Sequence, residues 1–324
     1  MRWRGMDGQF SDFLVIGGGM AGLACADELA RNGASVVVLD KGRGPGGRMA
    51  ARRVEISDAT VSFDHGAQYF TARDPAFRET VAAWEAAGVA ARWPAAGEDA
   101  WVGVPGMNAP IRTMAQALDV RWSVRAERLV RDGAHWRVEA GEQSFTATRV
   151  LVAVPAEQAA VLLAEPAPDL AALAAGVESA PCWAVMAGFD APLPLADTFR
   201  SATGPVSWAA RNSAKPGRAS AEAWVIHASP QRSRELVDHP KDEVAQILLA
   251  DFFAATGTAP VAPAHLDAHR WLYALPAALA GEGARYDAAR GIGIAGDWLH
   301  SPRVEGAFLS GRALARQAAI GAGQ

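Results

Sequence analysis

The chain has 324 residues, of which 50% are hydrophobic and 20% are charged, and its formal net charge is −4. This length allows one large domain or two interleaved domains, and a negative net charge without a basic block excludes nucleic acid as the main partner. Two cysteines without disulfide or metal-ligand spacing, and no apolar stretch long enough to span a bilayer, predict a cytoplasmic protein that binds neither metal nor membrane.

Residues 12–42 predict a strand, a glycine-rich turn, a helix and a second strand that together bind a dinucleotide. The apolar run at residues 13–16 ends at Gly17, Gly19 and Gly22, which have the G-x-G-x-x-G spacing. We expect Gly17 to allow the tight turn, Gly19 to let backbone N–H groups approach a pyrophosphate, and Gly22 to let helix and strand pack closely. The pyrophosphate is then expected at the helix N-terminus. The alternative is a turn that is only structural.

The end of this segment predicts the contact with the ribose. Gly33 is expected to end the helix, and residues 35–39 are expected to form a buried parallel strand. Asp40 ends that strand about 20 residues beyond the glycines, where a carboxylate accepts hydrogen bonds from an adenosine ribose.

A second glycine cluster, KGRGPGGRMAARR at residues 41–53, follows directly. Gly46 and Gly47 allow the backbone to pass close to a flat or phosphorylated group, and Arg48 can donate to a phosphate or a ring carbonyl as a bidentate group. Lys41 is assigned to the same cofactor site. The alternative is a solvated connection to a hairpin.

Residues 64–71 predict a strand end over which a planar ring lies. Gly66 and Ala67 are small enough for a ring to rest on their backbone. Gln68, Tyr69 and Phe70 are then expected to line the ring, with core packing as the alternative for the aromatic residues. His65 is either a proton shuttle or a hydrogen-bonded structural residue.

Later segments predict the rest of the fold. Residues 74–88 form an amphipathic helix ending at Gly88, and residues 120–155 form a meander of strands. From residue 156 to about 287, the runs CWAVMAGF, PVSWAAR, EAWVIHAS and HLDAHRWLYA predict a mainly antiparallel sheet, and residues 242–257 predict a helix.

The closing block, GIGIAGDWLHSPRVEGAFLSGRALARQAA, predicts a buried strand that ends at Gly296 and Asp297, then a helix that starts near Val304. The carboxylate can hold ribityl hydroxyls, and the first helical turn, with Val304 and Ala307, can direct its N–H groups and dipole at the N1/C2=O edge of a flavin. A domain that binds only NAD needs no such return, so we expect FAD. No cysteine follows Cys182, which favours noncovalent FAD.

Several of these segments resemble a known family. VIGGGMAGL, LDKGRGPGGRMA and FDHGAQYFTA resemble the flavin amine oxidase superfamily, whose second glycine motif contacts FAD. DHGAQYFTARDPAF, SAKPGR, WVIHASP and HRWLYALP are more similar to its renalase-like bacterial branch. The resemblance spans residues 12–318 and places Val124 where family members pack a backbone against adenine.

This resemblance implies an α/β fold in which a Rossmann-type FAD-binding domain is interleaved with a mainly antiparallel-sheet substrate domain. We expect the FAD-binding domain over residues 12–75, 120–156 and 288–324, and the substrate domain over residues 76–119 and 157–287.

Residue patterns that the second domain lacks limit the classes of reaction that the protein can catalyse. Its sequence shows no nucleophile with a base, no metal cluster and no paired carboxylates, which favours hydride transfer to a flavin over covalent, hydrolytic or metal catalysis. The renalase-like resemblance implies oxidation of the 2- and 6-dihydro isomers of NAD(P), with molecular oxygen reoxidising the flavin to give hydrogen peroxide. The alternatives are an amine or polyamine oxidase and a flavoprotein that only binds. The active-site lysine of monoamine oxidases is not assigned among Lys41, Lys215 and Lys241.

The small-molecule substrate is expected along one strand and one turn. Trp271 and Tyr273 should lie near the flavin ring, with His269 on the same face of the strand and Arg270 on the opposite face. The catalytic candidates are therefore Gln68, Trp271, Tyr273 and His269. The substrate-binding candidates are the basic turn of Lys215 and Arg218, which could meet the phosphates of a dinucleotide, together with Tyr69 and Arg270. For most of the tryptophans, core packing is the favoured interpretation.

Overall fold

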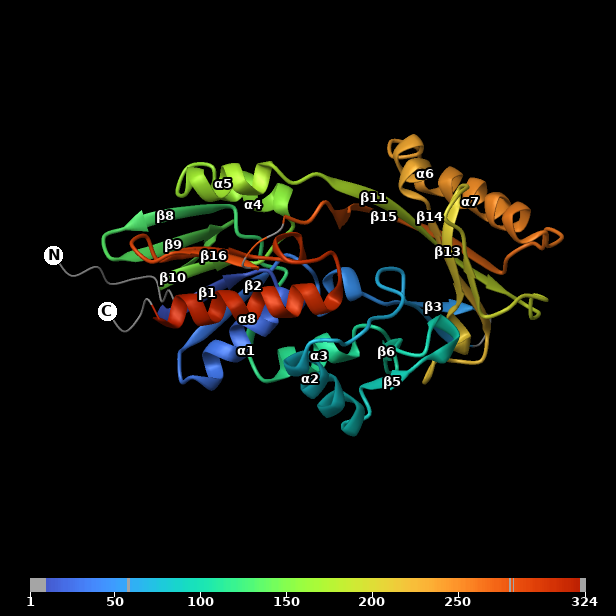
Figure 1. Ribbon diagram of the computed structural model, residues 1–324. Coiled ribbons are helices and arrows are strands. Elements are labelled where there is room, and N and C mark those ends of the chain that lie inside the picture. Colours follow the sequence, from blue (N-terminus) through green and yellow to red (C-terminus); the bar gives the residue numbers. More distant parts are fainter. Residues whose placement is uncertain (1–9, 57–58, 280, 282, 321–324) are drawn as a thin grey trace. The chain divides into compact units, whose positions relative to one another are not determined.

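The computed structural model describes residues 10–56, 59–279, 281 and 283–320, and these form two compact units. The first unit contains the described parts of Met1–Gly47, Ile111–Glu178 and Ala277–Gln324, and the second contains those of Arg48–Pro110 and Ser179–Pro276 (Figure 1). The expected α/β class, with a Rossmann-type unit and a second unit built on an antiparallel sheet, is confirmed.

An eight-stranded sheet forms the centre of the first unit. Six strands lie in the order β16, β17, β10, β1, β2 and β7, and β9 pairs with both β10 and β8. The strands are β1 (Phe10–Ile16), β2 (Val36–Asp40), β7 (Asp119–Trp122), β8 (Arg128–Asp132), β9 (His135–Ala140), β10 (Gln143–Val152), β16 (Ala284–Asp287) and β17 (Ile292–Ala295). β1, β2, β7, β10 and β17 run parallel. Strands of a parallel sheet are covered on both faces, which explains the continuous apolar runs of β1 and β2.

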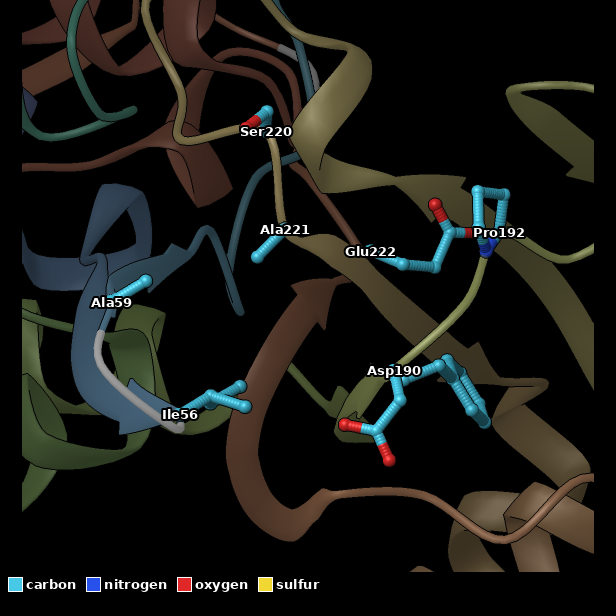
Figure 2. A pocket seen from close by; sticks show the side chains of 8 residues that line it. Ile56, Ala59, Asp190, Pro192, Ser220, Ala221 and Glu222 are labelled. Carbon is cyan, nitrogen blue, oxygen red and sulfur yellow. The ribbon is translucent and has the colours of Figure 1, made fainter.

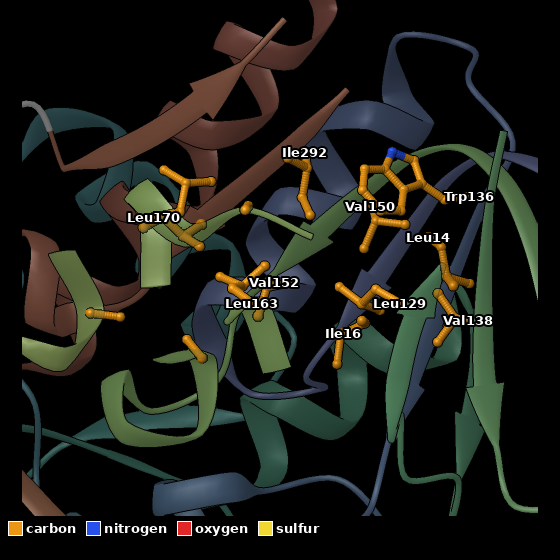
Figure 3. Packing of buried hydrophobic residues seen from close by; sticks show 14 of the residues in the cluster. Leu14, Ile16, Leu129, Trp136, Val138, Val150, Val152, Leu163, Leu170 and Ile292 are labelled. Atoms are coloured by element: carbon orange, nitrogen blue, oxygen red, sulfur yellow. The ribbon is translucent and has the colours of Figure 1, made fainter. Parts of the chain in front are cut away.

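Helices cover both faces of this sheet (Figure 1). α1 (Met20–Arg31) and α8 (Val304–Ile320) pack so closely that an ideal Cβ on Gly311 would lie 2.0 Å from the carbonyl oxygen of Ala21. On the other face, α4 (Ala156–Leu163) and α5 (Pro168–Ala175) bury Leu163 and Leu170 in a core shared with β1, β9 and β10 (Figure 3). α3 (Ala109–Gln116) and the short η4 (Asp297–Leu299) complete the connections.

The second unit is built on an antiparallel sheet with the strand order β12, β13, β14, β11 and β15. Its strands are β11 (Ser179–Phe189), β12 (Thr198–Arg200), β13 (Val206–Arg211), β14 (Glu222–Ala228) and β15 (His265–Pro276). α7 (Lys241–Thr256) covers one face, where Trp183, Trp224 and Phe252 are buried. The hairpin of β3 (Arg52–Ile56) and β4 (Ala59–Phe63) packs on the opposite face through Val61 and Phe63. The remaining elements are η1 (Gly47–Met49), α2 (Pro75–Ala86), β5 (Ala90–Arg92), η2 (Pro94–Ala96), β6 (Trp101–Gly103), η3 (Asn212–Ala214) and α6 (Pro230–Glu235).

The boundaries of the two units differ from those expected. Residues 48–75 group with the second unit rather than with the nucleotide-binding unit, because the hairpin of β3 and β4 packs on the antiparallel sheet. Residues 111–119, 157–178 and 277–287 group with the first unit, since α4 and α5 pack in its core and β16 pairs with β17. Composition alone did not reveal this, because the shift toward alanine begins near residue 156, whereas the chain enters the second unit only at Ser179.

The predicted helices are observed. The helix expected to end at Gly33 is α1, and the helices expected over residues 74–88 and 242–257 are α2 and α7. Across the residues that the structure describes, no helix combines the length and the apolarity needed to cross a bilayer.

Candidate functional site

The glycine turn of the first unit lies where β1 ends and α1 begins. Gly17 has a φ of 111°, and an ideal Cβ there would lie 2.3 Å from the carbonyl oxygen of Ala153. A Cβ on Gly22 would lie 1.8 Å from the carbonyl oxygen of Gly17. A Cβ on Gly19 would meet no atom of the described residues within 4 Å. The first two glycines are therefore needed for chain packing, whereas Gly19 borders open space beside the helix N-terminus.

That N-terminus is suited to an anion. No side chain caps α1, and its first turn carries no acidic residue, so its first backbone N–H groups have no counter-charge from the helix itself. Ligands of open α/β sheets bind outside the carboxyl ends of the parallel strands, which is where this turn lies. The open space at Gly19 and the uncapped helix fit the pyrophosphate of a dinucleotide.

Asp40 lies at the end of the neighbouring strand, β2. Its two carboxylate oxygens accept hydrogen bonds from the backbone N–H groups of Gly18 and Gly42, both at 2.6 Å. These bonds fix the carboxylate beside the glycine turn, and each oxygen keeps a second lone pair for a ribose hydroxyl. Gly47 brings the second glycine cluster back to the first, because its ideal Cβ would lie 3.5 Å from the Cα of Gly19. Gly46 is buried next to it.

The loop after β7 is held beside the same strand end. The N–H of Val124 donates to the carbonyl oxygen of Asp40, and the N–H of Ser123 donates to that of Gly42. Ser123 has a φ of 61°, which is uncommon for a residue other than glycine and is maintained here by these bonds. Lys41 instead directs its ammonium at the side-chain oxygen of Gln158, 2.8 Å away. Burial and the charge of Arg125 lower the pKa of Lys41.

The closing block forms a second helix start at this edge of the sheet. The N–H of Gly296 donates to Oγ of Ser310 at 2.8 Å, and Asp297 is buried just after the end of β17. α8 begins at Val304, as expected. The N–H of Ala307 already donates to the carbonyl oxygen of Arg303, so the N–H of Ala307 is engaged within the chain at this helix start.

The second unit contains a fully buried charged cluster, which we call the Asp64 cluster and define as Asp64, Gln68, Lys215 and Arg218. Oδ2 of Asp64 lies 2.6 Å from Nη2 of Arg218 and 3.1 Å from Nζ of Lys215. The exposed fractions of the three charged side chains are 0% for Asp64 and Lys215 and 1% for Arg218. Oδ1 of Asp64 accepts the backbone N–H of Met107 at 2.8 Å.

This cluster corrects the expectation that Lys215 and Arg218 form a basic turn facing phosphates. The turn folds inward instead, and Gly217 at its centre has a φ of 73° and packs against Val104 and Pro105. Lys215 and Arg218 therefore both form ion pairs with Asp64. We did not single out Asp64 from the sequence, and the signal that could have revealed it is a carboxylate at a buried strand end in a chain with only three lysines.

Gln68 has a fixed amide. Its nitrogen donates to the carbonyl oxygens of Asp64 and Gly66, and its oxygen accepts from Nζ of Lys215 at 3.1 Å. An amide nitrogen has two hydrogens, so the nearby His227 ring, 3.3 Å from Nε2 of Gln68, cannot receive a third. Gln68 therefore orients Lys215.

The ionisation of the cluster follows from its burial. Burial lowers the pKa of Lys215 to about 8, opposed by the charge of Asp64 and assisted by that of Arg218. Burial alone would raise the pKa of Asp64, but Lys215 and Arg218 hold it below its ordinary value. Burial also lowers the pKa of His227 to about 4. That imidazole is neutral at pH 7.

An aromatic group lies beside this cluster in the second unit. The ring of His65 stacks on Trp271 with 5.2 Å between centroids, and His269 contacts both rings edge-on. The indole N–H of Trp271 donates to the carbonyl oxygen of His65 at 2.9 Å. The expectation that His269 and Trp271 share one face of β15 is confirmed. Burial, with smaller contributions from the charges of His269 and Arg52, lowers the pKa of His65 to about 4, so this ring is also neutral at pH 7.

Beside this group, the backbone of Gly66 and Ala67 packs closely on the backbone of Arg48. An ideal Cβ on Gly66 would lie 2.0 Å from the carbonyl oxygen of Arg48 and 3.5 Å from the Trp271 ring. The N–H of Ala67 donates to the same carbonyl at 2.8 Å. The guanidinium of Arg48 lies 3.4 Å from the carbonyl oxygen of Ala274.

Two substrate-binding candidates are engaged elsewhere. Arg270 donates to the carbonyl oxygen of Val237 and lies over the ring of Trp183, on the helix-covered face of the sheet, so it faces away from Trp271, as expected. Its role in substrate binding stays a prediction. The hydroxyl of Tyr69 accepts from Arg200 at 3.1 Å. Tyr273 is half-buried on β15, where the pairing with β11 is irregular between Trp271 and Leu275.

A separate hollow of about 460 Å³ also lies on the second unit (Figure 2). Its lining residues are Ile56, Ala59, Phe189, Asp190, Pro192, Ser220, Ala221 and Glu222. The carboxylate of Glu222 is already bound by Arg211 and by the indole N–H of Trp224 at 2.8 Å. This hollow shares no residue with the Asp64 cluster or the aromatic group.

Two families match the sequence. Residues 92–319 match the family described as flavin containing amine oxidoreductase, and residues 15–84 match the NAD(P)-binding Rossmann-like domain. An opine oxidase chain from Rhizobium meliloti (strain 1021) is 41% identical over 63 residues. This match spans 19% of the chain and only 14% of that relative's length.

Solved structures share the fold. A candidate protoporphyrinogen oxidase from Exiguobacterium sp. 255-15 has a TM-score of 0.74 at 15% identity, covering 99% of this chain and 100% of that one. Cyclohexylamine oxidase from Brevibacterium oxydans IH-35A has a TM-score of 0.72 at 14% identity, covering 97% of this chain and 100% of that one.

Proposed function

The chain belongs to the flavin-containing amine oxidoreductase family, and from this premise we propose that it is an FAD-dependent oxidase of the renalase type. Its donors would be the 2- and 6-dihydro isomers of NAD(P), which lose hydride to become NAD(P)+, and its acceptor would be molecular oxygen, which is reduced to hydrogen peroxide. When bound, FAD would supply the hydride acceptor, N5, and the route by which electrons reach oxygen.

The charge balance beside the aromatic group carries this proposal. Among the described residues, two carboxylates lie there, and each pairs with two cations: Asp64 with Lys215 and Arg218, and Asp267 with Arg52 and Lys241. These six side chains therefore leave an excess of two positive charges. His65 and His227 add no charge at pH 7, since the pKa of each is about 4.

This balance favours an anionic donor over an ammonium. An alkylammonium would find both carboxylates already neutralised, whereas a dinucleotide with its phosphates would be attracted. At about 10 Å and an effective dielectric of about 20, one charge changes the binding free energy by roughly 1–2 kcal/mol. A dihydropyridine donor also needs no protein base to release hydride, and the buried Asp64 is fully bonded.

The chain's own residues would then bind the cofactor and orient the donor. The turn at Gly17 to Gly22 and the start of α1 would hold the pyrophosphate, Asp40 the ribose, and Asp297 with the start of α8 the ribityl chain and ring edge. His65 and Trp271 present rigid neutral rings against which a flat donor can pack, since the bond from Trp271 to the His65 carbonyl fixes their geometry.

An amine oxidase is the second candidate, and one observation favours it. Lys215 is the only buried lysine of the three in the chain, whereas Lys41 and Lys241 are exposed. It is therefore the residue that could correspond to the active-site lysine of monoamine oxidases.

Removing one exposed positive charge separates the two candidates. Lys241→Gln should raise the KM of a dihydro-NAD(P) isomer about fivefold with little change in kcat, because an attractive charge is lost. An ammonium donor would instead gain affinity. The matched control is Arg128→Gln, which removes a cation that is 57% exposed in the first unit and pairs with Glu165. A lower KM for the isomers in Lys241→Gln would contradict the proposal.

A further inference from the structure

The Asp64 cluster contains two cations and one carboxylate, and both cations use the same carboxylate oxygen. Arg218 has the shorter contact with Oδ2, 2.6 Å against 3.1 Å for Lys215. Arg218 also donates to the carbonyl oxygens of Gly103 and Pro216. Among the described residues, Nε of Arg218 has no hydrogen-bond partner, but the guanidinium reaches three acceptors and the ammonium of Lys215 reaches two.

Lys215 has weaker compensation. Besides Asp64, its ammonium contacts the neutral amide oxygen of Gln68 at 3.1 Å and lies 5.3 Å from the centre of the Trp93 ring. The third titratable neighbour, His227 on β14, is neutral at pH 7 because burial lowers its pKa to about 4. Two buried cations that share one carboxylate leave a net charge of plus one that water does not solvate. Burying such an uncompensated charge costs free energy.

Chemistry decides which group relieves this charge. A guanidinium does not lose its proton in proteins, whereas a buried ammonium does so readily. We propose that Arg218 is a positioning residue that holds the shared oxygen of Asp64 and thereby makes Lys215 the group that gives up its proton, converting the cluster from a cationic to a neutral one. The proton passes to solvent, and Lys215 becomes a neutral amine hydrogen-bonded by Gln68 and Asp64.

The consequence for catalysis rests on the proposed function. An anionic donor binds a net-positive cluster better than a neutral one, so its KM should rise as the pH increases through the titration of Lys215. Burial and the charge of Arg218 both lower the pKa of Lys215, to about 8, which places this rise in an accessible range.

The chain allows a direct test because it has only three lysines. Labelling the holoenzyme with lysine carrying 13C at Cε gives three signals, and Lys41→Arg and Lys241→Arg assign the remaining one to Lys215. In the wild type, the Lys215 signal should titrate near pH 8. Arg218→Gln removes the competing cation, so Asp64 then pairs with Lys215 alone. This change should raise the midpoint by at least one pH unit, a tenfold change in proton affinity. Arg218→Lys keeps the competing charge and should leave the midpoint close to that of the wild type.

The inference is overturned if Arg218→Gln leaves the Lys215 midpoint unchanged or lowers it. If Arg218→Gln does not fold, the wild type decides alone, because a Lys215 signal that stays protonated up to pH 10 contradicts the proposal. Asp64→Asn, which removes the counter-charge, should shift the midpoint below that of the wild type. If the Lys215 midpoint shifts as expected but the dihydro isomers do not reduce the flavin, the proposed function is overturned and this inference stands. If the isomers reduce the flavin but the midpoint does not shift, this inference is overturned and the proposed function stands.

Discussion

Gly19→Val should abolish FAD binding without unfolding the protein. Gly19 has φ −84° and ψ −173°, which valine can adopt, and within the part of the chain that the structure describes an ideal Cβ there meets no atom within 4 Å. The cost to the fold is therefore that of an unfavourable residue at a helix N-cap, about 1 kcal/mol. The cost to binding is larger, because a branched side chain prevents two N–H groups from reaching the pyrophosphate, and each lost hydrogen bond costs about 1.5–3 kcal/mol. We expect a loss of roughly 3–6 kcal/mol, which is about 10²- to 10⁴-fold in Kd.

The assay is FAD titration of the apoprotein by calorimetry, with circular dichroism to confirm the fold. Gly176→Ala is the matched control, since Gly176 ends α5 with φ −74° and its ideal Cβ makes only ordinary contacts, the nearest at 3.4 Å. It should bind FAD like the wild type. Gly22→Ala should instead destabilise the fold itself, because its Cβ would lie 1.8 Å from a carbonyl oxygen. A folded Gly19→Val variant with wild-type FAD affinity would show that the glycine turn is only structural.

Three further outcomes are expected. Acid precipitation of the holoprotein should leave a yellow supernatant, because we expect noncovalent FAD. Both cysteines are poor nucleophiles, since burial raises the pKa of Cys25 and raises that of Cys182 to about 12. Yellow colour that stays in the protein pellet would contradict this expectation. Gly66→Ala should lower the free energy of unfolding by at least about 2 kcal/mol in urea titrations, because its Cβ would lie 2.0 Å from the Arg48 carbonyl oxygen, and an unchanged midpoint would refute the close approach. Stability should fall as the pH drops from about 6.5 toward 4, because His65 and His227 are neutral in the folded state with pKa values of about 4 while the unfolded chain protonates near 6.5. The loss should be roughly 2 kcal/mol per histidine at pH 5, and His227→Gln should reduce it; equal stability of the wild type at pH 7 and pH 5 would argue against buried neutral rings.

The nucleotide-binding unit could be predicted in detail because its chemistry is local in sequence. Gly17, Gly19, Gly22 and Asp40 lie within 24 residues, and the turn, the helix start and the strand end are each signalled by neighbouring residues. Periodicity also predicted α2 and α7 and the antiparallel sheet, since a buried face leaves a regular pattern.

The Asp64 cluster could not be predicted, because it is built from contacts between distant segments. Asp64 and Lys215 are separated by 151 residues, and a polar turn such as KPGR is typical of the surface. In the structure this turn folds inward: Gly217 packs against Val104 and Pro105, and Lys215 and Arg218 pair with Asp64. The expected domain boundaries differ from the observed ones for the same reason. The hairpin of β3 and β4 directly follows the nucleotide-binding motifs in sequence, but it packs on the sheet of the second unit.

Anaerobic mixing of the holoenzyme with single donors tests the central claim most directly. The absorbance of oxidised flavin should bleach rapidly with the 2- or 6-dihydro isomers of NAD(P), and one equivalent of NAD(P)+ should form for each flavin reduced. Primary and secondary amines should leave the spectrum unchanged over the same period. Rapid bleaching by an amine, with none by either isomer, would contradict the renalase-type proposal and establish an amine oxidase.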